Sequence, residues 1–313
     1  MRCALTIAAV LLLWAALPAA ESPPETPAPR VPSGCRAADA TTAEPYSGTG
    51  WAKEIVHEKT AIVLVFIPAG KFEMGSPDSE KGRRKDEGPL HTVTITRPFY
   101  LGKYEVTQAQ RLGLMGSNPS GFLADRHPLD RGSRKSPPPP EVTPDTYDQR
   151  PVERVSWEDC RGFLAKAGDG LRLPTEAQWE CACRAGTATP CAFGETLSTA
   201  QANHNGNLAQ WEHATTGQGR RGTIPVGSLA ASAWGLYDMH GNVIEWVSDR
   251  YGERYCAASP SDDPQGPSEG SYVAARGGSW NSYAQGCRSS QRWFYGPRER
   301  NFGIGLRVAL DAK

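Results

Sequence analysis

The sequence predicts a mixed α+β domain that is rich in loops and contains little regular secondary structure. Glycine and proline account for 33 and 26 of the 313 residues, a share that favours turns over long helices or strands. Two segments in the middle of the chain carry a strong helix pattern. Beyond them, short apolar patches alternate with Gly, Asn, Ser and Asp without a fixed repeat. This arrangement excludes a solenoid or propeller and favours one compact domain.

The N-terminal segment has the pattern of a secretory signal peptide over residues 1–20. Arg2 precedes an apolar run from Ala4 to Leu17, and two alanines end the segment. A signal anchor that is not cleaved is the alternative. We expect a secreted or periplasmic protein without a transmembrane segment after signal removal, because no later apolar run reaches the ~20 residues that a spanning helix needs. Residues 21–50 are rich in Pro, Ala, Thr and Glu and predict a flexible linker.

The remainder of the chain, up to residue 313, is expected to form the folded domain. Ala61–Pro68 has strand character, Gly70–Gly75 is expected to turn the chain, and His91–Ile95 alternates apolar and polar residues as a half-buried strand does. Together these segments predict a β-hairpin. Residues 113–150 predict an irregular, exposed insertion, because their four consecutive prolines cannot donate hydrogen bonds to a sheet.

Two helices have clear start signals. Ser156 precedes the apolar-periodic segment Trp157–Ala167, and acidic residues follow it in the first turn, so a helix is expected to begin there. Thr175 is the candidate N-cap of a second helix, which is expected to run to Arg184 and to end at Gly186. No later segment has a helix pattern of comparable strength.

Charge and cysteine content limit the possible functions. Lys plus Arg and Asp plus Glu number 34 each, so no net field attracts nucleic acid, and we expect no nucleic-acid partner. Loss of the signal would leave seven cysteines: Cys35, Cys160, Cys181, Cys183, Cys191, Cys256 and Cys287. In an exported protein, an odd number implies at least one free thiol or an intermolecular bridge.

A series of motifs then resembles the formylglycine-generating enzyme, or sulfatase-modifying factor, family. In family order these motifs are Phe66–Gly70, Met74–Ser76, Tyr104–Thr107, Pro151–Val152, Val155–Trp157, Arg172–Glu180, Gly235–Val243, Glu245–Trp246, Arg276–Trp280 and Gly305–Arg307. The resemblance covers Ala61 to Leu310. It implies a variant of the C-type-lectin-like fold, which agrees with the loop-rich α+β domain expected from composition.

The resemblance also implies which chemistry should be present. The family's oxidase holds copper(I) with two cysteines spaced five apart just after the Gly-Gly-Ser motif, and copper(I) prefers soft thiolates. Here Ser282 stands at the first of these positions. Cys287 follows five residues later, but the next residues resemble the segment after a different, structural cysteine of the family. Both copper ligands are therefore expected to be missing, and copper is not an expected cofactor.

The cysteine pairing implied by the resemblance is a disulfide between Cys183 and Cys287. Its alternative is that Cys287 stays a lone reactive thiol. The pairing of the other cysteines, Cys35, Cys160, Cys181, Cys191 and Cys256, is left open, because even four cysteines allow three connectivities.

The family resemblance also implies a ligand groove at the Gly-Gly-Ser turn. Ser279 matches a family serine of the substrate groove, Trp280 would form an aromatic wall, and Ser282 is the third groove candidate. The alternative is a purely structural turn, in which the glycines permit tight backbone geometry.

Calcium is the cofactor that the resemblance implies. One family site matches Asp238, the backbone of Gly241 and Val243, and Glu245, which would offer several oxygens to one hard cation. Ordinary polar groups of a turn are the alternative.

A second family site matches Asn203 and the backbone of His204. The aspartate expected downstream is replaced by Gln218, so this site loses a charge and is predicted to be weaker or empty.

Three functional hypotheses follow. The first is an exported, divergent family member without copper-dependent formylglycine-generating activity. The second is a formylglycine-generating oxidase that acts on a sulfatase cysteine, which requires two of Cys181, Cys183, Cys256 and Cys287 to converge as free thiols. The third is a non-catalytic module that binds a peptide or glycan. An exported protein or peptide is the expected partner.

Overall fold

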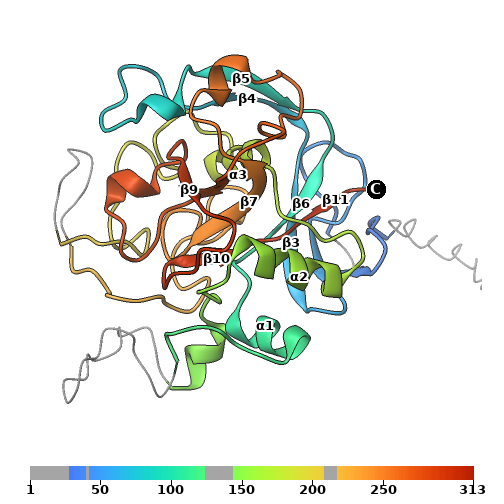
Figure 1. The fold of residues 1–313 in the computed structure, drawn as a ribbon. Helices are drawn as coiled ribbons and strands as arrows, with labels where there is room; N and C mark the ends of the chain where they lie inside the picture. The colour runs from blue at the N-terminus through green and yellow to red at the C-terminus, as the bar shows by residue number, and fades with distance from the viewer. Residues whose placement is uncertain (1–27, 40–41, 124–143, 208–216) are drawn as a thin grey trace, which may run out of the picture.

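The structure, a computed structural model, describes residues 28–39, 42–123, 144–207 and 217–313 (Figure 1). The predicted signal peptide, residues 1–20, and the four prolines of the predicted insertion lie outside the described residues. The described chain forms two larger sheets, one hairpin and three α-helices, joined by long loops and short 3-10 turns. The prediction of a loop-rich α+β domain is thus confirmed.

The larger sheet contains five antiparallel strands. They are β1 (Cys35–Ala37), β2 (Glu54–His57), β3 (Ile62–Ile67), β6 (Phe99–Gly102) and β11 (Ala309–Asp311), and they follow this spatial order. Five of the six β3 side chains are buried, because this strand lies in the middle of the sheet. The sheet therefore brings the N-terminal and C-terminal parts of the domain together.

The second sheet contains four strands in the order β10 (Ile304–Leu306), β7 (Ile244–Arg250), β8 (Val273–Arg276) and β9 (Trp293–Tyr295). The β10–β7 pair is parallel and the other pairs are antiparallel. A separate hairpin pairs β4 (Gly70–Met74) with β5 (His91–Ile95). The loop between β8 and β9 carries the Gly-Gly-Ser motif.

The three α-helices are α1 (Gln108–Met115), α2 (Trp157–Ala167) and α3 (Glu176–Arg184), and the 3-10 turns are η1 (Lys85–Glu87), η2 (Pro144–Gln149), η3 (Tyr255–Ala258) and η4 (Ala284–Cys287). The predictions for α2 and α3 are confirmed, with the Ser156 and Thr175 hydroxyls accepting from backbone amides of their first turns. The central helix is α3, which packs against β4, β5, β7 and β8 (Figure 1).

The sequence missed α1. Thr107 caps this helix, and the Gln110 side chain accepts from the Thr107 amide in return, which is a complete capping box. The buried side chains of α1 are the polar residues Gln108 and Arg111. A search for apolar periodicity therefore gave no signal here, although the capping pattern was readable.

The predicted pairing of Ala61–Pro68 with His91–Ile95 in one hairpin is wrong. The β5 strand pairs with β4, in the segment that was expected to be a turn, whereas β3 pairs with β2 and β6. The sequence of β4 alternates exposed Lys71 and Glu73 with Phe72 and Met74, which is a strand pattern that its first glycine obscured.

The prediction of a flexible linker over 21–50 is corrected for the described part of that segment. Cys35 is buried in β1, which pairs with β2, and the Arg30 guanidinium lies 4.3 Å from the centre of the Trp51 ring. The Glu44 carboxylate accepts hydrogen bonds from the backbone amides of Tyr46, Ser47 and Thr49. A few anchoring residues fix a segment whose average composition resembles a linker.

The predicted exposed insertion, 113–150, is also corrected at its described ends. It begins inside α1 and ends in η2. Phe122 and Arg150 are fully buried, and the Phe122 ring packs edge-on against Trp280 at a centroid distance of 5.4 Å. The ends of this segment therefore belong to the core and support the wall of the groove described below.

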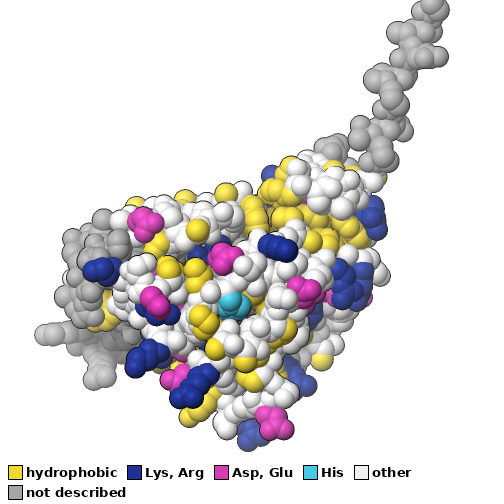
Figure 2. All heavy atoms as spheres, turned by 90° about the horizontal axis from the view of Figure 1, so that it is seen from above, with side chains coloured by type: hydrophobic (Ala, Val, Ile, Leu, Met, Phe, Trp, Pro, Cys, Tyr) yellow, Lys and Arg dark blue, Asp and Glu magenta, His cyan; other side chains and the backbone are white. Residues whose placement is uncertain are grey.

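No helix in the described ranges is long and apolar enough to span a membrane. On the face shown in Figure 2, Lys and Arg side chains are interspersed with Asp and Glu, and neither sign forms a broad patch.

A buried ionic network holds α3 to the loop between β8 and β9. The Arg276 guanidinium donates to Glu176 and Glu180, at 2.8 Å in each case, and Arg292 donates to both Glu176 oxygens at 2.8 and 2.9 Å. Arg288 donates to Glu87 at 2.6 Å and also contacts Glu80. Arg184 also pairs with Glu180, so the network contains four arginines and four glutamates, whose charges balance. They are Arg184, Arg276, Arg288, Arg292, Glu80, Glu87, Glu176 and Glu180.

The network predicts a large cost for loss of one charge. Glu176→Gln leaves two buried guanidiniums short of a carboxylate, and we expect the free energy of unfolding to fall by about 3–5 kcal/mol in urea denaturation. The control is Glu158→Gln, which removes the exposed Arg298 pair and should cost no more than about 1 kcal/mol. Equal losses in the two variants would contradict this role of the network.

Candidate functional site

The Gly-Gly-Ser turn is built from two glycines with left-handed backbone. Gly277 and Gly278 have φ angles of +100° and +73°. A Cβ at Gly278 would lie 2.6 Å from the Cys287 Sγ and 2.7 Å from a backbone oxygen, so only glycine fits there. The turn is closed by the Ser279 amide, which donates to the Ser282 Oγ at 3.0 Å, and by the Ser282 amide, which donates to the Ser279 carbonyl at 2.9 Å.

The turn forms one side of a groove with a volume of about 680 Å³. The three predicted residues, Ser279, Trp280 and Ser282, all line it. Trp293 and Tyr295 of β9 and the segment that ends at Gly303 also line the groove. The structure therefore brings the candidate groove residues together, as expected if this turn shapes a ligand groove.

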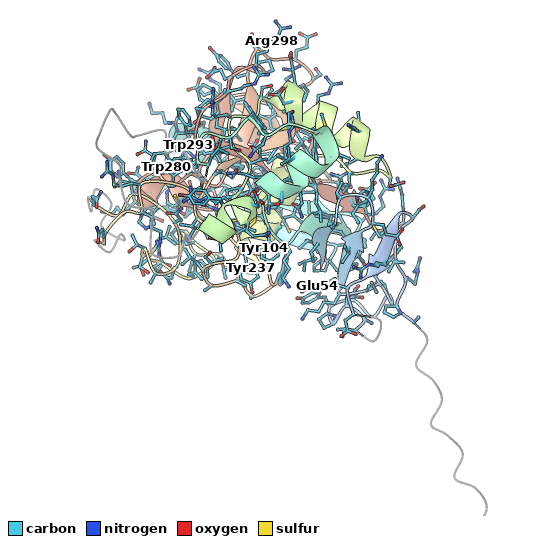
Figure 3. The ribbon with its side chains drawn as sticks, turned by 90° about the horizontal axis from the view of Figure 1, so that it is seen from below. Glu54, Tyr104, Tyr237, Trp280, Trp293 and Arg298 are labelled. Carbon is cyan, nitrogen blue, oxygen red and sulfur yellow. The ribbon has the colours of Figure 1, made fainter. Side chains whose placement is uncertain are left out.

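The aromatic walls of the groove are held in place through their polar atoms. The Trp280 indole N–H donates to the Phe302 carbonyl at 2.9 Å, and the Trp293 indole N–H donates to the Gly286 carbonyl at 3.1 Å. Figure 3 shows the two tryptophans close to each other, and both line the groove. Because both indole N–H groups are engaged by the protein, the rings can offer a ligand only their apolar faces.

Sequence reasoning did not assign Tyr295 of β9 or Phe302 to the groove. Trp293, Tyr295 and Phe302 lie beyond the Gly-Gly-Ser motif, and no motif quoted for the family includes them. A cluster of three consecutive aromatic residues at 293–295 was the available signal.

The cysteines lie outside the groove, and no thiol is among its described lining residues. Cys287 is fully buried beneath Gly278, and burial raises the pKa of its thiol. Burial also raises the pKa of the Cys183 thiol to about 12. Copper(I) needs two thiolates within bonding reach, so the residues of this groove do not fit it.

The seven described cysteines carry no disulfide in this structure, so the Cys183–Cys287 bridge stays a prediction. The Cys183 Sγ contacts the Ser289 Oγ at 3.6 Å and the His240 Nε2 at 3.7 Å. Cys256 lies elsewhere, with its Sγ 3.6 Å from the Asp86 carbonyl. Cys183 lies close enough to Cys287 to contribute, after burial, to the raised pKa of the Cys287 thiol, but neither cysteine is among the described residues that line the groove.

His240 is a structural residue between these loops. Its Nε2 accepts from the Ala192 amide at 3.0 Å, which leaves the proton on Nδ1, 2.7 Å from the Cys287 carbonyl. Burial lowers the pKa of His240 to about 4. The ring is thus neutral, with both nitrogens engaged by the backbone.

The first predicted calcium site is part of a buried charge cluster. The Glu245 carboxylate accepts two hydrogen bonds from the Arg307 Nε at 3.0 Å, one from its Nη2 at 2.7 Å, and one from the Trp179 indole at 2.6 Å. One Asp238 oxygen accepts from the Gly227 amide at 2.7 Å. Because Arg307 and Trp179 engage both Glu245 oxygens, this residue does not fit the role of a calcium ligand here.

Sequence reasoning missed two members of this cluster, Glu105 and Arg307, although both lie in quoted motifs. The Glu105 carboxylate accepts from the Asn242 side chain at 2.7 Å and from the Val243 amide at 3.0 Å. The buried carboxylates of Glu105 and Glu245 and the half-buried carboxylate of Asp238 thus lie around the Arg307 guanidinium. Burial raises the pKa of Asp238 to about 6, and burial together with Asp238 raises the pKa of Glu105.

The second predicted calcium site contains a buried oxygen with no partner. The Asn203 Nδ2 donates to the Gly222 carbonyl and to the Asn242 Oδ1, at 3.0 Å each, but its Oδ1 has no hydrogen-bond partner among the described residues. A buried amide oxygen that accepts no hydrogen bond can serve as a ligand atom for a hard cation. Gln218, which stands where the family site has an aspartate, is exposed and supplies no carboxylate.

Together, these features define a C-type-lectin-like α+β domain with a groove at its Gly-Gly-Ser turn. A match to the sulfatase-modifying factor enzyme 1-like domain covers residues 53–312, and the chain belongs to this family. The solved structure of PvdO from Pseudomonas aeruginosa is 32% identical, with a TM-score of 0.63 over 81% of this chain and 95% of that chain.

Two curated relatives show how the domain is used elsewhere. The formylglycine-generating enzyme of Streptomyces coelicolor is 32% identical over 285 residues, which cover 79% of this chain and 89% of that protein. The serine/threonine-protein kinase pkn1 of Chlamydia caviae is 33% identical over 258 residues. That match covers 80% of this chain but only 38% of the kinase.

Proposed function

We propose that this protein is an exported, divergent family member that does not generate formylglycine with copper and uses the groove to bind a peptide segment of another exported protein. The observation that carries the proposal is the composition of the groove. Where the copper route needs two thiolates, the described lining offers the Ser279 and Ser282 hydroxyls.

The same lining supports binding over catalysis. No Asp, Glu, His, Cys or Lys is among the described residues that line the groove, and Arg84 is its one charged residue. A serine hydroxyl becomes a nucleophile only with an adjacent base, and the nearest polar partner of Ser279 is Ser282, at 3.3 Å between the two Oγ atoms. Rigid aromatic walls, hydroxyls and amides suit recognition of an extended chain.

Export rests on the signal-peptide pattern of residues 1–20. A peptide of an exported protein is the partner because the family resemblance places a substrate groove at Ser279. A glycan is the other ligand class that aromatic faces can stack on.

The proposal predicts no aldehyde product in a formylglycine assay. A peptide with the sequence Cys-X-Pro-X-Arg is incubated with the purified protein, copper and oxygen, and the product is analysed by mass spectrometry. The peptide should remain unmodified, because the described residues of the groove offer no thiol pair to hold copper. The formylglycine-generating enzyme of Streptomyces coelicolor, under the same conditions, is the positive control. Conversion by this protein would establish the oxidase hypothesis instead.

We further propose that calcium supports the fold at the second site, with the Asn203 Oδ1 and the His204 carbonyl as ligands. The orphaned Asn203 oxygen supports this choice over the first site, where Arg307 engages Glu245. When bound, the ion would supply positive charge next to a cluster with excess negative charge.

Calcium is therefore expected to raise thermal stability. An excess of 100-fold over the dissociation constant should add about 2.7 kcal/mol to the free energy of unfolding, and magnesium should add less. Asn203→Ala should lower stability in chelator and abolish the gain from calcium. A thermal scan with the same midpoint in calcium, magnesium and chelator would show that no such site exists, and a full gain in Asn203→Ala would place it elsewhere.

A further inference from the structure

A second cleft, with a volume of about 640 Å³, lies between α2, the start of α3 and the end of β11. It shares no described lining residue with the Gly-Gly-Ser groove. In Figure 1, β11 and the C-terminus lie on one side of the domain and β9 lies on the other. A cleft of this size can hold a small organic ligand. This hollow, the α2 cleft, is therefore separate from the groove proposed above to bind a peptide.

The floor of the α2 cleft is apolar. Four residues of α2 line it at helical positions i, i+4, i+7 and i+8, which share one face of the helix: Trp157, Arg161, Leu164 and Ala165. Leu164, Leu171 and Leu173 are buried members of the hydrophobic core that also line the cleft. The core therefore reaches the surface here, and an apolar group in the cleft would extend its packing.

Trp157 holds the Arg161 guanidinium at the cleft. The Trp157 indole N–H donates to the Val247 carbonyl at 3.0 Å, which fixes the ring. The Arg161 guanidinium lies 5.0 Å from the centre of this ring, within the range of a cation–π contact. Arg161 is exposed and makes no hydrogen bond or ion pair with its side chain among the described residues. Its N–H donors are thus available to a ligand.

The charged residues that line the cleft carry excess positive charge. Four are basic and two are acidic: Arg97, Arg161, Arg172, Lys313, Asp263 and Asp311. Asp311 pairs with Arg172 at 2.6 Å and with Lys313 at 3.5 Å. Asp263 accepts from the Thr96 amide at 2.9 Å and makes no ion pair within the described ranges. Because two carboxylates cannot neutralise four cations, this lining attracts an anion.

From the apolar floor and the excess positive charge we infer that the α2 cleft binds a small apolar monoanion, such as a medium-chain carboxylate. Its apolar body would lie against Leu164, Leu171 and Leu173, and its carboxylate would accept hydrogen bonds from Arg161. A cation of the same shape would meet like charge, and a small hydrophilic anion would leave the floor without contacts. This site goes beyond the proposed peptide groove and does not depend on it.

Isothermal titration calorimetry of the full-length mature protein with acetate, butanoate, hexanoate, octanoate and octylammonium tests this inference. Octanoate should bind at least roughly tenfold more tightly than octylammonium, because only the carboxylate meets a complementary charge. Affinity should rise about threefold for each added CH₂ group from butanoate to octanoate, because each group covers more of the apolar floor. Acetate at the same concentration should give no measurable binding.

Two variants locate the octanoate. Arg161→Gln should weaken its binding about threefold to fivefold, because an exposed guanidinium contributes modestly. Ala165→Trp should abolish binding, because Ala165 is exposed on α2 and the larger side chain would fill part of the cleft. Arg298→Gln is the matched control, because Arg298 is exposed, pairs with Glu158 and does not line the cleft. Thermal scans of all variants report whether the fold is intact.

Two results would overturn the inference. The first is absence of octanoate binding, or equal binding of octanoate and octylammonium. The second is octanoate binding that stays unchanged in both Arg161→Gln and Ala165→Trp, which would place the ligand elsewhere on the protein. Neither result bears on the Gly-Gly-Ser groove, whose proposed function is tested by the formylglycine assay.

Discussion

Three buried arginines hold the loop on which the groove depends. Arg276 begins this loop at the end of β8, and Arg288 and Arg292 lie where it returns to β9. Each donates to buried glutamates from other parts of the chain, above all Glu176 at the start of α3. A buried guanidinium that lost its partner would be costly, so the loop has little freedom to rearrange. Its conformation decides which side chains face the groove and which enter the core.

This constraint explains why the same loop directs hydroxyls into the groove and buries its thiol. The turn at Gly277 and Gly278 directs Ser279, Trp280 and Ser282 to the groove, and η4 places Cys287 beneath the turn. The family fold is retained, while the chemistry depends on the few side chains that the loop exposes. A domain of this type can therefore be a formylglycine-generating enzyme in one protein and a part of a much longer kinase in another.

Local features of the fold could be predicted from the sequence, whereas long-range pairing could not. The α2 and α3 boundaries followed from Ser156 and Thr175, because a cap is encoded within four residues. The partner of β5 was wrong because strand pairing depends on distant segments. The groove candidates at the Gly-Gly-Ser turn came from the family resemblance, but Trp293 lies on a strand whose position depends on the whole sheet.

The buried ionic network likewise could not be predicted from the sequence, because its ion pairs join distant segments. Glu176 and Arg292 are 116 residues apart, and neither stands out in a sequence with 34 residues of each charge. The expected calcium ligand Glu245 could not be distinguished from a structural carboxylate until Arg307 was placed beside it.

The central proposal is that the described residues of this groove form no copper site, and a copper(I) titration tests it most directly. The reduced protein competes with a colorimetric chelator for copper(I) under anaerobic conditions, with the formylglycine-generating enzyme of Streptomyces coelicolor as reference. We predict that the chelator retains the copper, because the described thiols are buried away from the groove and protonated. Withdrawal of one equivalent of copper by the native protein, lost on substitution of Cys287 by serine, would contradict the account.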